Sequence, residues 1–578
     1  MFVNTLKRGL SSRDERGFSL IVAIVVLSVA TLLLFGAVDA VFYNTGPTRA
    51  DLDQKRALLA ADAGLSVYDS ALNSNPNFWE SCPVSGAAGA TGTTGTAVTV
   101  PGSTNDGSIE TYTYENLPAT GQTGCSGANP ISTMIEKSNT PANGTFRVKF
   151  TGTSQPTTGT ARAPITRTLV AQFNAANFLQ YVYFTNFEIL DPAATGDSVT
   201  GCSVYYWTSP APATGQNRNG NCGGAINFIT GDVINGPMHS NDDVSISGSP
   251  QFGSTTSDAV ETPGFYSNNG TPTTTCTGCD IAGTLNTAAP TLQLPPNDLQ
   301  LLQVADGNVA TQTNGCYTKA GCVFTGPTTI VLTGSTFTVT NASYNGGAAT
   351  TGLSPSNGVI YVTNASGGCT PTNTYTPYIV NSSASYSNAD NTGCGNATVS
   401  GTYSNSLTIG TDNDIIINGN ITPTGVTVNS SSGGTPPTPS GTALLGLIAN
   451  DFVRVYHPLS GTRPSASFAS CPNPNTNATG SLTNLYVYAA ILAVNHSFIV
   501  DNFDCGTTLG DLYVYGVIAQ NFRGPVGTES GGTVVSGYTK GYYYDTRFQA
   551  LSPPYFLDPV SAGWEVNRVT ECDSSTGC

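Results

Sequence analysis

The chain has 578 residues, of which only 10% are charged, and its formal net charge at pH 7 is −16. This length exceeds one ordinary domain. The acidic balance excludes nucleic-acid binding through overall charge, although a local basic patch would still be compatible with it. Gly (65), Tyr (26) and Phe (23) are abundant, which favours a β-rich protein with many turns over a helical enzyme.

The chain begins with a polar stretch, residues 1–17, followed by the uncharged apolar segment FSLIVAIVVLSVATLLLFGAV at residues 18–38. That segment is long enough to cross a bilayer as a helix. A secretory signal places its cleavage site after the apolar core. Here no small-residue cleavage signal closes the apolar run, so we expect processing before it, between Gly17 and Phe18.

The motif RGFSL at residues 16–20, placed before a long apolar helix, resembles the prepilin leader of type IV pilins and type II secretion pseudopilins. The resemblance covers residues 8–72. It implies that a dedicated peptidase cuts after Gly17 and that the new N-terminal Phe18 is methylated. One residue departs from the pattern, because the fifth mature residue is Val22 where these families usually have Glu. The alternative interpretation is a plain N-terminal anchor helix.

Residues 49–72 have the apolar spacing of an amphipathic helix, and Gly46-Pro47 should interrupt the helix before it. The portion ALLAADAGLSVYDSAL resembles the N-terminal region of PilX-type minor pilins, with Asp62 where that family commonly has Glu. A second interpretation, compatible with the first, is an amphipathic helix that packs on a sheet. The residues expected on one face are Leu52, Leu58, Leu59, Ala63, Val67 and Leu72.

Three alternating runs follow, at residues 109–117, 144–152 and 165–173, and they predict antiparallel strands. Together with the helix they form the layout of a small pilin head. From residue 178 onward, short β runs are separated by Gly, Asn and Asp, which predicts a stacked β architecture.

The clearest internal repeat is NLYVYAAI at 484–491, which recurs as DLYVYGVI at 511–518, 27 residues on. A partial third copy lies at 446–458. A period of this length indicates one coil of a β-helix or solenoid, in which neighbouring coils bury each other's apolar faces. The alternative is a β-sandwich with two similar hairpins. We expect the tail to cap the last coil with Phe556 and Trp564.

The predicted fold class is therefore α+β, mostly β. It comprises a long N-terminal pilin-type helix, a small antiparallel pilin-like sheet and a large β-helix or solenoid-like domain. The expected divisions are a prepilin leader at 1–17, a transmembrane and filament helix at 18–75, a pilin-like β head at 76–177 and a solenoid-like domain at 178–578.

All 14 cysteines lie beyond residue 81, which suits an oxidising compartment. The alternative to disulfides at Cys276 and Cys279 is zinc, but no second pair and no neighbouring His completes a site. Sequence alone does not fix the connectivity. Pairing in sequence order gives Cys82–Cys125, Cys202–Cys222, Cys276–Cys279, Cys316–Cys322, Cys369–Cys394, Cys471–Cys505 and Cys572–Cys578.

Residues that could carry chemistry are few. His239, His457 and His496 have no metal-ligand spacing. The polar clusters at 239–243 and 412–414 could cap turns or bind a cation such as calcium, although no full calcium loop is present. No nucleophile motif or phosphate-binding loop occurs, so we predict no enzyme, no catalytic residue and no cofactor. Tyr and Asn/Thr-rich faces are consistent with an ordinary solenoid surface and with adhesion to glycans.

The leading functional hypothesis is a minor subunit, placed at the tip of a type IV pilus or related filament, that acts in assembly and surface adhesion. In pilin families the missing Glu offsets the N-terminal ammonium of the subunit ahead. Val22 cannot do so, and a tip subunit has no such partner to neutralise. A large head also fits an end better than a shaft.

The resemblance implies several partners and locations. The partners are other pilins through the N-terminal helix, the prepilin peptidase, the cytoplasmic membrane before assembly and an unknown surface ligand. The locations are the cytoplasmic membrane and an extracellular filament. Alternatives are a K-type pseudopilin, which also lacks the Glu and is also large, a DNA-uptake minor pilin and a membrane-anchored surface enzyme. Removing residues 1–17 removes four basic and two acidic residues, so the mature charge of −18 argues against DNA.

Overall fold

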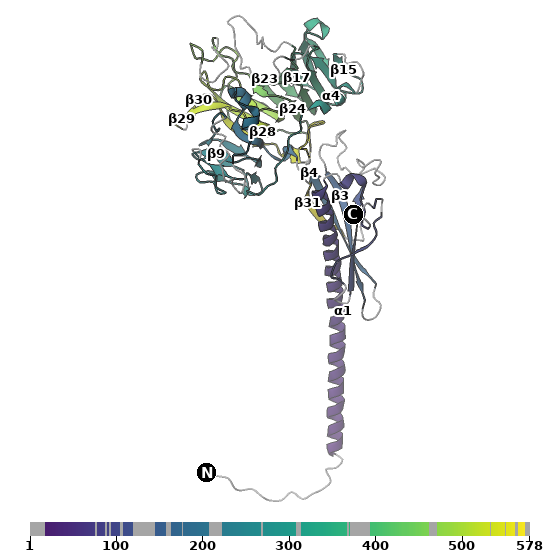
Figure 1. The fold of residues 1–578 in the computed structure, drawn as a ribbon. Coiled ribbons are helices and arrows are strands. Elements are labelled where there is room, and N and C mark those ends of the chain that lie inside the picture. The colour runs from purple at the N-terminus through teal and green to yellow at the C-terminus, as the bar shows by residue number, and fades with distance from the viewer. Residues whose placement is uncertain are drawn as a thin grey trace, which may run out of the picture. The chain divides into compact units, whose positions relative to one another are not determined.

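The protein is described from a computed structural model that forms two compact units (Figure 1). Among the described residues, strands account for 43% and helices for 15%, so the protein is mostly β. The first unit comprises Met1–Thr133, Phe146–Phe173 and Val566–Cys578, and the second comprises Met134–Thr145 and Asn174–Glu565. The structure describes residues 18–578 apart from 76–77, 87–89, 92–93, 104–107, 119–144, 158–162, 176, 207–221, 268–269, 308–313, 367–368, 370–392, 462–470, 532, 550, 561–563 and 573–578.

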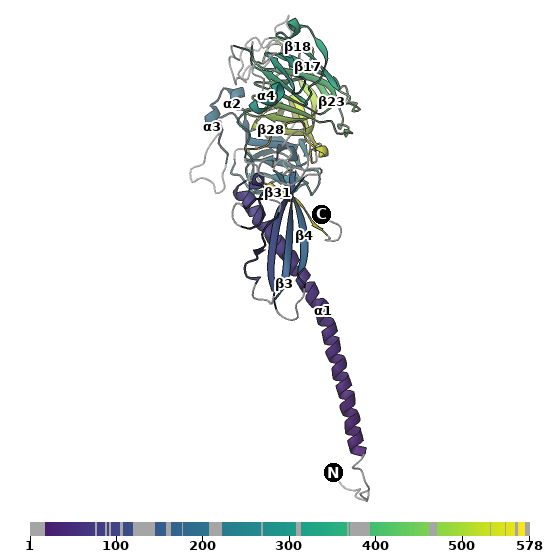
Figure 2. The same cartoon turned by 90° about the vertical axis from the view of Figure 1, so that its right-hand side faces the viewer.

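The first unit is helix α1 (Phe18–Ser74) and a five-stranded sheet (Figure 2). The bounds of α1 include Gly46 and Pro47, where the sequence predicts an interruption. A proline removes one helical hydrogen bond and bends a helix without having to end it. Side-chain environments within α1 are described for residues 24–31 and 50–74. The short helix η1 (Phe78–Ser81) follows.

The sheet of the first unit has the order β1-β2-β3-β4-β31. Strands β2 and β3 are antiparallel, with Ser108 opposite Pro156 and Leu117 opposite Arg147. The three strands predicted from alternating runs are therefore present. The bounds are β1 Val98–Thr99, β2 Ser108–Leu117, β3 Thr145–Pro156, β4 Ile165–Ala175 and β31 Trp564–Cys572.

The end of the chain passes from the second unit back to the first. Trp564, expected to cap the last coil with Phe556, is buried in the second unit, which extends to Glu565, and is also the first residue of β31, a strand of the first unit's sheet. Arg167 Nε on β4 donates to Glu571 Oε1 on β31 at 2.5 Å. Phe556 packs in the second unit and is only 2% exposed. The second unit is thus inserted between two strands of the first, which sequence order alone did not indicate.

The buried face of helix α1 contains both small and large residues. Ala57, Ala60 and Ala61 are 0–1% exposed, whereas Leu59 is 66% exposed. The backbone of β3 comes so close that a Cβ on Gly152 would lie 1.9 Å from the Ala57 carbonyl oxygen. The predicted face is therefore correct only in part, because Leu72 is buried and Leu58 and Ala63 are half-buried, whereas three of its members are exposed. The exposed residues are Leu52, Leu59 and Val67, and the buried ones include Ala57, Ala60, Ala61, Leu65, Tyr68 and Leu72.

The second unit is built from strands that pair in parallel from one coil of chain to the next. One ladder runs through β16, β20, β22, β24, β26, β28, β5, β8, β11 and β14. The bounds are Cys322–Thr325, Val359–Thr363, Leu407–Thr411, Leu445–Ala449, Leu485–Ala493, Thr508–Arg523, Tyr183–Leu190, Met238–Ser240, Ala259–Glu261 and Thr284–Asn286, in that order.

Two further parallel ladders complete the coils. One contains β17 (Thr328–Gly334), β21 (Ala397–Tyr403), β23 (Ile415–Pro423), β25 (Val453–Val455) and β27 (Phe498–Val500). The other continues from β28 through β30 (Thr533–Tyr544), β7 (Val233–Asn235), β10 (Gln251–Phe252) and β13 (Asp280–Ile281).

Smaller elements complete the second unit. Antiparallel pairs are formed by β18 with β17 and β19, by β15 with β16 and by β29 with β30, while β6, β9 and β12 form a three-stranded sheet. The strand bounds are β6 Phe228–Ile229, β9 Val244–Ser247, β12 Phe265–Tyr266, β15 Gly315–Cys316, β18 Thr336–Asn341, β19 Thr350–Leu353 and β29 Gly527–Ser530. The helices are η5 Phe178–Gln180, α2 Pro192–Thr195, α3 Val199–Cys202, α4 Leu299–Asp306, η7 Asn345–Gly347 and η8 Thr546–Gln549.

The 27-residue repeat corresponds to the offset between two strands, β26 and β28, that pair in parallel. Leu485 lies opposite Leu512 and Ala493 opposite Gln520, so the two copies stack along their whole length. The partial copy is the next step, with Gly446 opposite Ala490. The inward apolar side chains of these coils join one continuous core. Sequence repetition therefore corresponds here to spatial stacking.

The order of the coils in space differs from their order in sequence. Strand β5, the first of the second unit, pairs with β28 on one side and with β8 on the other. The chain thus starts in the middle of the stack and proceeds to β14. It then returns to the opposite end at β16 and finishes beside its own start. We call the contact of β28 and β30 with β5 and β7 the seam.

A run of asparagines at the turns continues across the seam. Asn521 Nδ2 donates to the Asn495 carbonyl (3.0 Å), Asn186 Nδ2 to Asn521 Oδ1 (2.8 Å) and Asn241 Nδ2 to Asn186 Oδ1 (2.9 Å). The segment that follows β14 also bonds to this row of asparagines, because the Leu292 N–H donates to Asn241 Oδ1 at 2.9 Å. These amides satisfy turn groups from coils that are distant in sequence.

Candidate functional site

The processing site predicted at Gly17 lies outside the described residues, as does the 1–17 leader. Phe18 is the first residue of α1, and only its backbone is described, as is also true of Val22. The predictions of cleavage, of methylation and of a special role for Val22 therefore stay predictions.

The described part of the apolar segment is exposed. Five consecutive or near-consecutive side chains of α1 are half or more accessible: Ile24 55%, Val25 55%, Val26 60%, Leu27 64% and Val29 50%. A helix that is apolar on every side needs an apolar surrounding. Searched over the residues that the structure describes, no helix qualifies by length and hydropathy as a membrane span.

A second exposed apolar surface lies further along α1. Leu52, Leu59 and Val67 are 47%, 66% and 46% exposed. At 100° per residue these positions fall within an arc of about 80°, away from the face that packs on the sheet. The helix thus has one face for its own sheet and one apolar face that the described residues of the first unit leave uncovered.

Five of the seven cysteine pairs expected from sequence order are disulfides: Cys202–Cys222, Cys276–Cys279, Cys316–Cys322, Cys369–Cys394 and Cys471–Cys505. Cys82 and Cys572 are also disulfide-bonded. Their expected partners, Cys125 and Cys578, lie outside the described residues. The bond between Cys276 and Cys279 removes the zinc interpretation, because a bonded sulfur is not a thiolate ligand.

Within the described part of the chain, one grouping has metal-ligand residue types, namely Cys471, Asp504 and Cys505. Both sulfurs belong to one disulfide, which leaves a single carboxylate. This grouping is therefore no metal site.

The polar cluster at 239–243 serves the turn in which it lies. Asp242 accepts from the backbone N–H of Glu188 (3.0 Å) and of Tyr206 (2.7 Å). His239 is 2% exposed and bonds Glu261 Oε2 (2.8 Å) and Asn241 Oδ1 (2.9 Å). These contacts favour turn capping over a cation site.

The cluster at 412–414 is likewise held by internal contacts. Asp412 accepts from the Thr363 hydroxyl and the Asn364 N–H, at 2.7 and 2.8 Å. Asp414 Oδ2 accepts from Arg454, which also bonds Asp501, each at 2.9 Å, and all three side chains are at most 2% exposed. The Arg454 pair and its neighbours are structural charges inside the coils.

The tyrosines of the 27-residue repeat stack on one another and are covered. Tyr486 stacks on Tyr513 with ring centroids 4.7 Å apart, and Tyr486, Tyr488 and Tyr513 are 2%, 1% and 8% exposed. The loop at 429–441 lies over them, since the Tyr486 hydroxyl donates to the Gly434 carbonyl at 3.0 Å. This loop thus packs on the tyrosines, and these rings do not form an open binding face.

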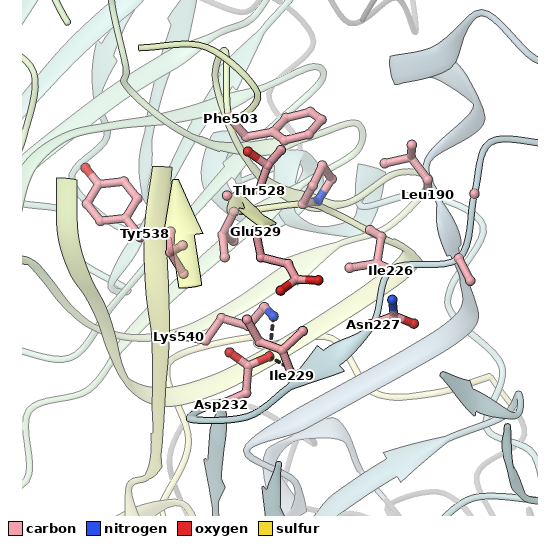
Figure 3. A pocket seen from close by; sticks show the side chains of 16 residues that line it. Leu190, Ile226, Asn227, Ile229, Asp232, Phe503, Thr528, Glu529, Tyr538 and Lys540 are labelled. Atoms are coloured by element: carbon pink, nitrogen blue, oxygen red, sulfur yellow. Dashed lines mark hydrogen bonds and ion pairs between the residues drawn. The ribbon is translucent and has the colours of Figure 1, made fainter. Parts of the chain in front are cut away.

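The most chemically distinct region is a cavity of about 280 Å³ at the seam (Figure 3). Its walls come from both ends of the second unit. They include Leu190, Ile226 and Asp232 from the start, and Phe503, Glu529 and Lys540 from the finish. Lys540 Nζ lies 2.5 Å from Asp232 Oδ2, with side-chain exposures of 12% and 2%.

A second buried ion pair lies beside this cavity. Arg523 Nη1 donates to Glu188 Oε2 at 2.9 Å and to the Ile226 carbonyl at 2.7 Å. The guanidinium carbon of Arg523 lies 3.6 Å from the centroid of the Phe228 ring. Burial lowers the pKa of Lys540, although Asp232 opposes that shift. The seam therefore concentrates cations and carboxylates in a surrounding of low polarity.

Sequence reasoning missed these four residues because each pair spans more than 300 positions. One signal was present. The chain has only 20 Lys and Arg, and Arg523 and Lys540 lie in the aromatic β runs QNFRGP and YTKGYYY. A cation inside such a run is expected to be buried and paired.

Comparison with known proteins returned no match among family models, curated proteins or solved structures.

Proposed function

We propose that the chain is a minor subunit of a type IV pilus or related filament, placed at its tip, and that its second unit is a β-solenoid head. The observation that carries the proposal is the uncovered apolar surface of α1. Residues 24–29 are exposed around the helix, and Leu52, Leu59 and Val67 are exposed on one side. Exposed apolar residues of this extent mark an interaction surface.

The apolar surface of α1 suits the membrane before assembly and the helices of other subunits after assembly. The uncharged segment 18–38 is long enough for a bilayer helix, and the same residues would pack against helices of other subunits after assembly. The RGFSL motif at 16–20 supports the same reading, as does the packing of residues 50–74 on an antiparallel sheet. Val22 and the insertion of a large second unit favour the tip over the shaft.

The parallel ladders of the second unit support a solenoid head, because three ladders share the same coils. The five disulfides of that unit are typical of a protein in an oxidising compartment outside the cytosol.

A processing variant tests the function. Gly17→Val should block cleavage, so the chain should stay in the membrane fraction and be missing from sheared filaments. Ser12→Val, in the same leader, serves as the matched control and should be processed and incorporated. Normal incorporation of an uncleaved Gly17→Val chain would refute the proposal.

A further inference from the structure

The seam holds a lysine and a carboxylate in a geometry suited to covalent bond formation. We propose that Lys540 and Asp232 condense into an intramolecular amide that joins the last coil of the second unit to the first. This proposal does not depend on the assignment to a filament.

The two side chains are held opposite each other by the sheet. Gly541 on β30 lies opposite Val233 on β7 in the parallel ladder, so the preceding residues, Lys540 and Asp232, are neighbours across the same pair of strands. Asp232 Oδ2 also accepts from the Ile229 N–H at 3.0 Å, which fixes the carboxyl group. The reacting groups are therefore oriented by the fold before any reaction.

The approach distance is short enough for attack. Lys540 Nζ is 2.5 Å from Asp232 Oδ2, and a carboxyl C–O bond is about 1.2 Å long, so Nζ lies within about 3.7 Å of Cγ. Reacting atoms held at about 3–3.5 Å can gain effective molarities of about 10⁵–10⁸ M. Such a gain offsets the unfavourable condensation of a free amine with a free carboxylic acid in water.

The surrounding favours the neutral pair that must react. Burial lowers the pKa of Lys540. An ion pair in a surrounding of low polarity can therefore pass its proton from the ammonium to the carboxylate and become an amine and a carboxylic acid. The wall residues Ile229 and Phe503 keep this part of the seam apolar.

The step balances within the protein. The Nζ lone pair attacks Cγ of the protonated Asp232 and forms a tetrahedral intermediate. Nζ then loses a proton, the Cγ–O bond to one oxygen breaks, and that oxygen leaves as water. No oxidation state changes, and no co-reactant is needed. The adjoining cavity of about 280 Å³ gives the water a place to leave.

A second carboxylate can move the proton. Glu529 lines the same cavity as Lys540 and is exposed to solvent, and Figure 3 shows its carboxylate among the lining side chains. We assign Glu529 the task of accepting the proton from Nζ and delivering it to the departing oxygen, as a general base and then a general acid.

Among the ion pairs of the described residues, this one combines a lysine with deep burial. The Lys55–Asp51 pair is 68% and 60% exposed, and the Lys149–Glu115 pair is 34% and 20% exposed. The other buried partners of carboxylates are His239 and His496, which are not amines, and the arginines Arg454, Arg523 and Arg547, whose guanidinium groups stay protonated. Lys540 is thus the amine that the fold prepares for acylation.

Peptide mapping of the reduced full-length chain tests the proposal. The peptides carrying Lys540 and Asp232 should elute as one branched species, lighter than their sum by one water. Lys540→Arg keeps the positive charge and should give two separate peptides. Glu529→Gln should accumulate the unlinked form.

Three results would contradict the proposal. Separate, unmodified peptides from the wild-type chain would overturn it. A loss of water that persists in Lys540→Arg would place the dehydration elsewhere. Complete linkage in Glu529→Gln would overturn the role given to that carboxylate. Lys540→Arg retains an ion pair with Asp232, so the variant should still fold. Formation of its five second-unit disulfides checks this, and it distinguishes loss of the amide from misfolding.

Discussion

The two units treat apolar and charged groups in opposite ways. The first unit leaves large apolar side chains of α1 in solvent, among them Leu27 and Leu59 at 64% and 66% exposure. The second unit covers its apolar coils on both sides and additionally buries ion pairs such as Arg454 with Asp414 and Asp501. The described residues of the first unit leave this apolar surface uncovered, whereas the second unit buries its apolar coils and pairs these charges internally.

The largest effect should come from the buried charges of the second unit. Arg454→Met removes the cation between two carboxylates that remain buried, so we expect a loss of about 3–5 kcal/mol in the free energy of unfolding. Chemical denaturation of the second-unit transition measures it. Lys55→Ala, which breaks an exposed pair on α1, should leave that transition unchanged. An Arg454→Met protein as stable as wild type would mean that these charges are not a closed internal network.

The second effect concerns the packed face of α1. Gly152→Val would place a side chain where a Cβ already lies 1.9 Å from the Ala57 carbonyl oxygen. Overpacking of this kind costs about 1–3 kcal/mol or more. Limited proteolysis should then cut α1 near residues 50–74, whereas Val67→Ala on the exposed face should not change the digestion pattern. Protection of the helix in Gly152→Val would contradict the packing described.

A third test uses pH. Tyr361 Oη lies 2.7 Å from Asp298 Oδ1 and 2.6 Å from Asp412 Oδ1. One hydroxyl proton serves one carboxylate, so the other contact needs a protonated carboxyl. Burial, reinforced by the charge of Asp412, raises the pKa of Asp298 well above its ordinary value.

A folded-state pKa above the unfolded one means that the native state binds the extra proton. The stabilisation is present at low pH and is lost as pH rises through the folded pKa of Asp298. Asp298→Asn should remove this component and flatten the dependence of unfolding free energy on pH. A wild-type stability that rises across that window, with no change in Asp298→Asn, would contradict the shared proton.

The smallest effect on stability should come from the exposed face of α1. Leu59→Glu should change the free energy of unfolding by no more than about 0.5 kcal/mol, because the side chain is already solvated. The same variant should lose incorporation into filaments, since a charge would enter the helix–helix contact. Unchanged incorporation would indicate that this face stays in solvent.

Local pattern was enough to predict much of the fold. The alternating runs predicted β2, β3 and β4, since antiparallel neighbours in sequence pair in space. The 27-residue repeat predicted the stacking of β26 on β28 because an identical offset places identical side chains in register. Pairing cysteines in order succeeded for five disulfides because each closes a short loop, with separations from 3 to 34 residues.

The remaining features depend on contacts that carry no local pattern. The seam pairs Arg523 with Glu188 and Lys540 with Asp232, which lie 335 and 308 residues apart. The return of β31 to the first sheet needs a partner strand that ends nearly 400 residues earlier. The buried face of α1 was predicted only in part, with Leu72 correct and Leu59 wrong, because periodicity counts apolar residues, while the close approach at Gly152 selects small ones.

The central claim is that this chain is cleaved before Phe18 and enters a filament through α1. The N-terminal residue of the protein recovered from sheared filaments tests it most directly. We expect an N-methylated phenylalanine, Phe18, at the start of the mature chain. Filament-borne protein that still carries residues 1–17, or absence of the protein from filaments under conditions in which it is made, would contradict it.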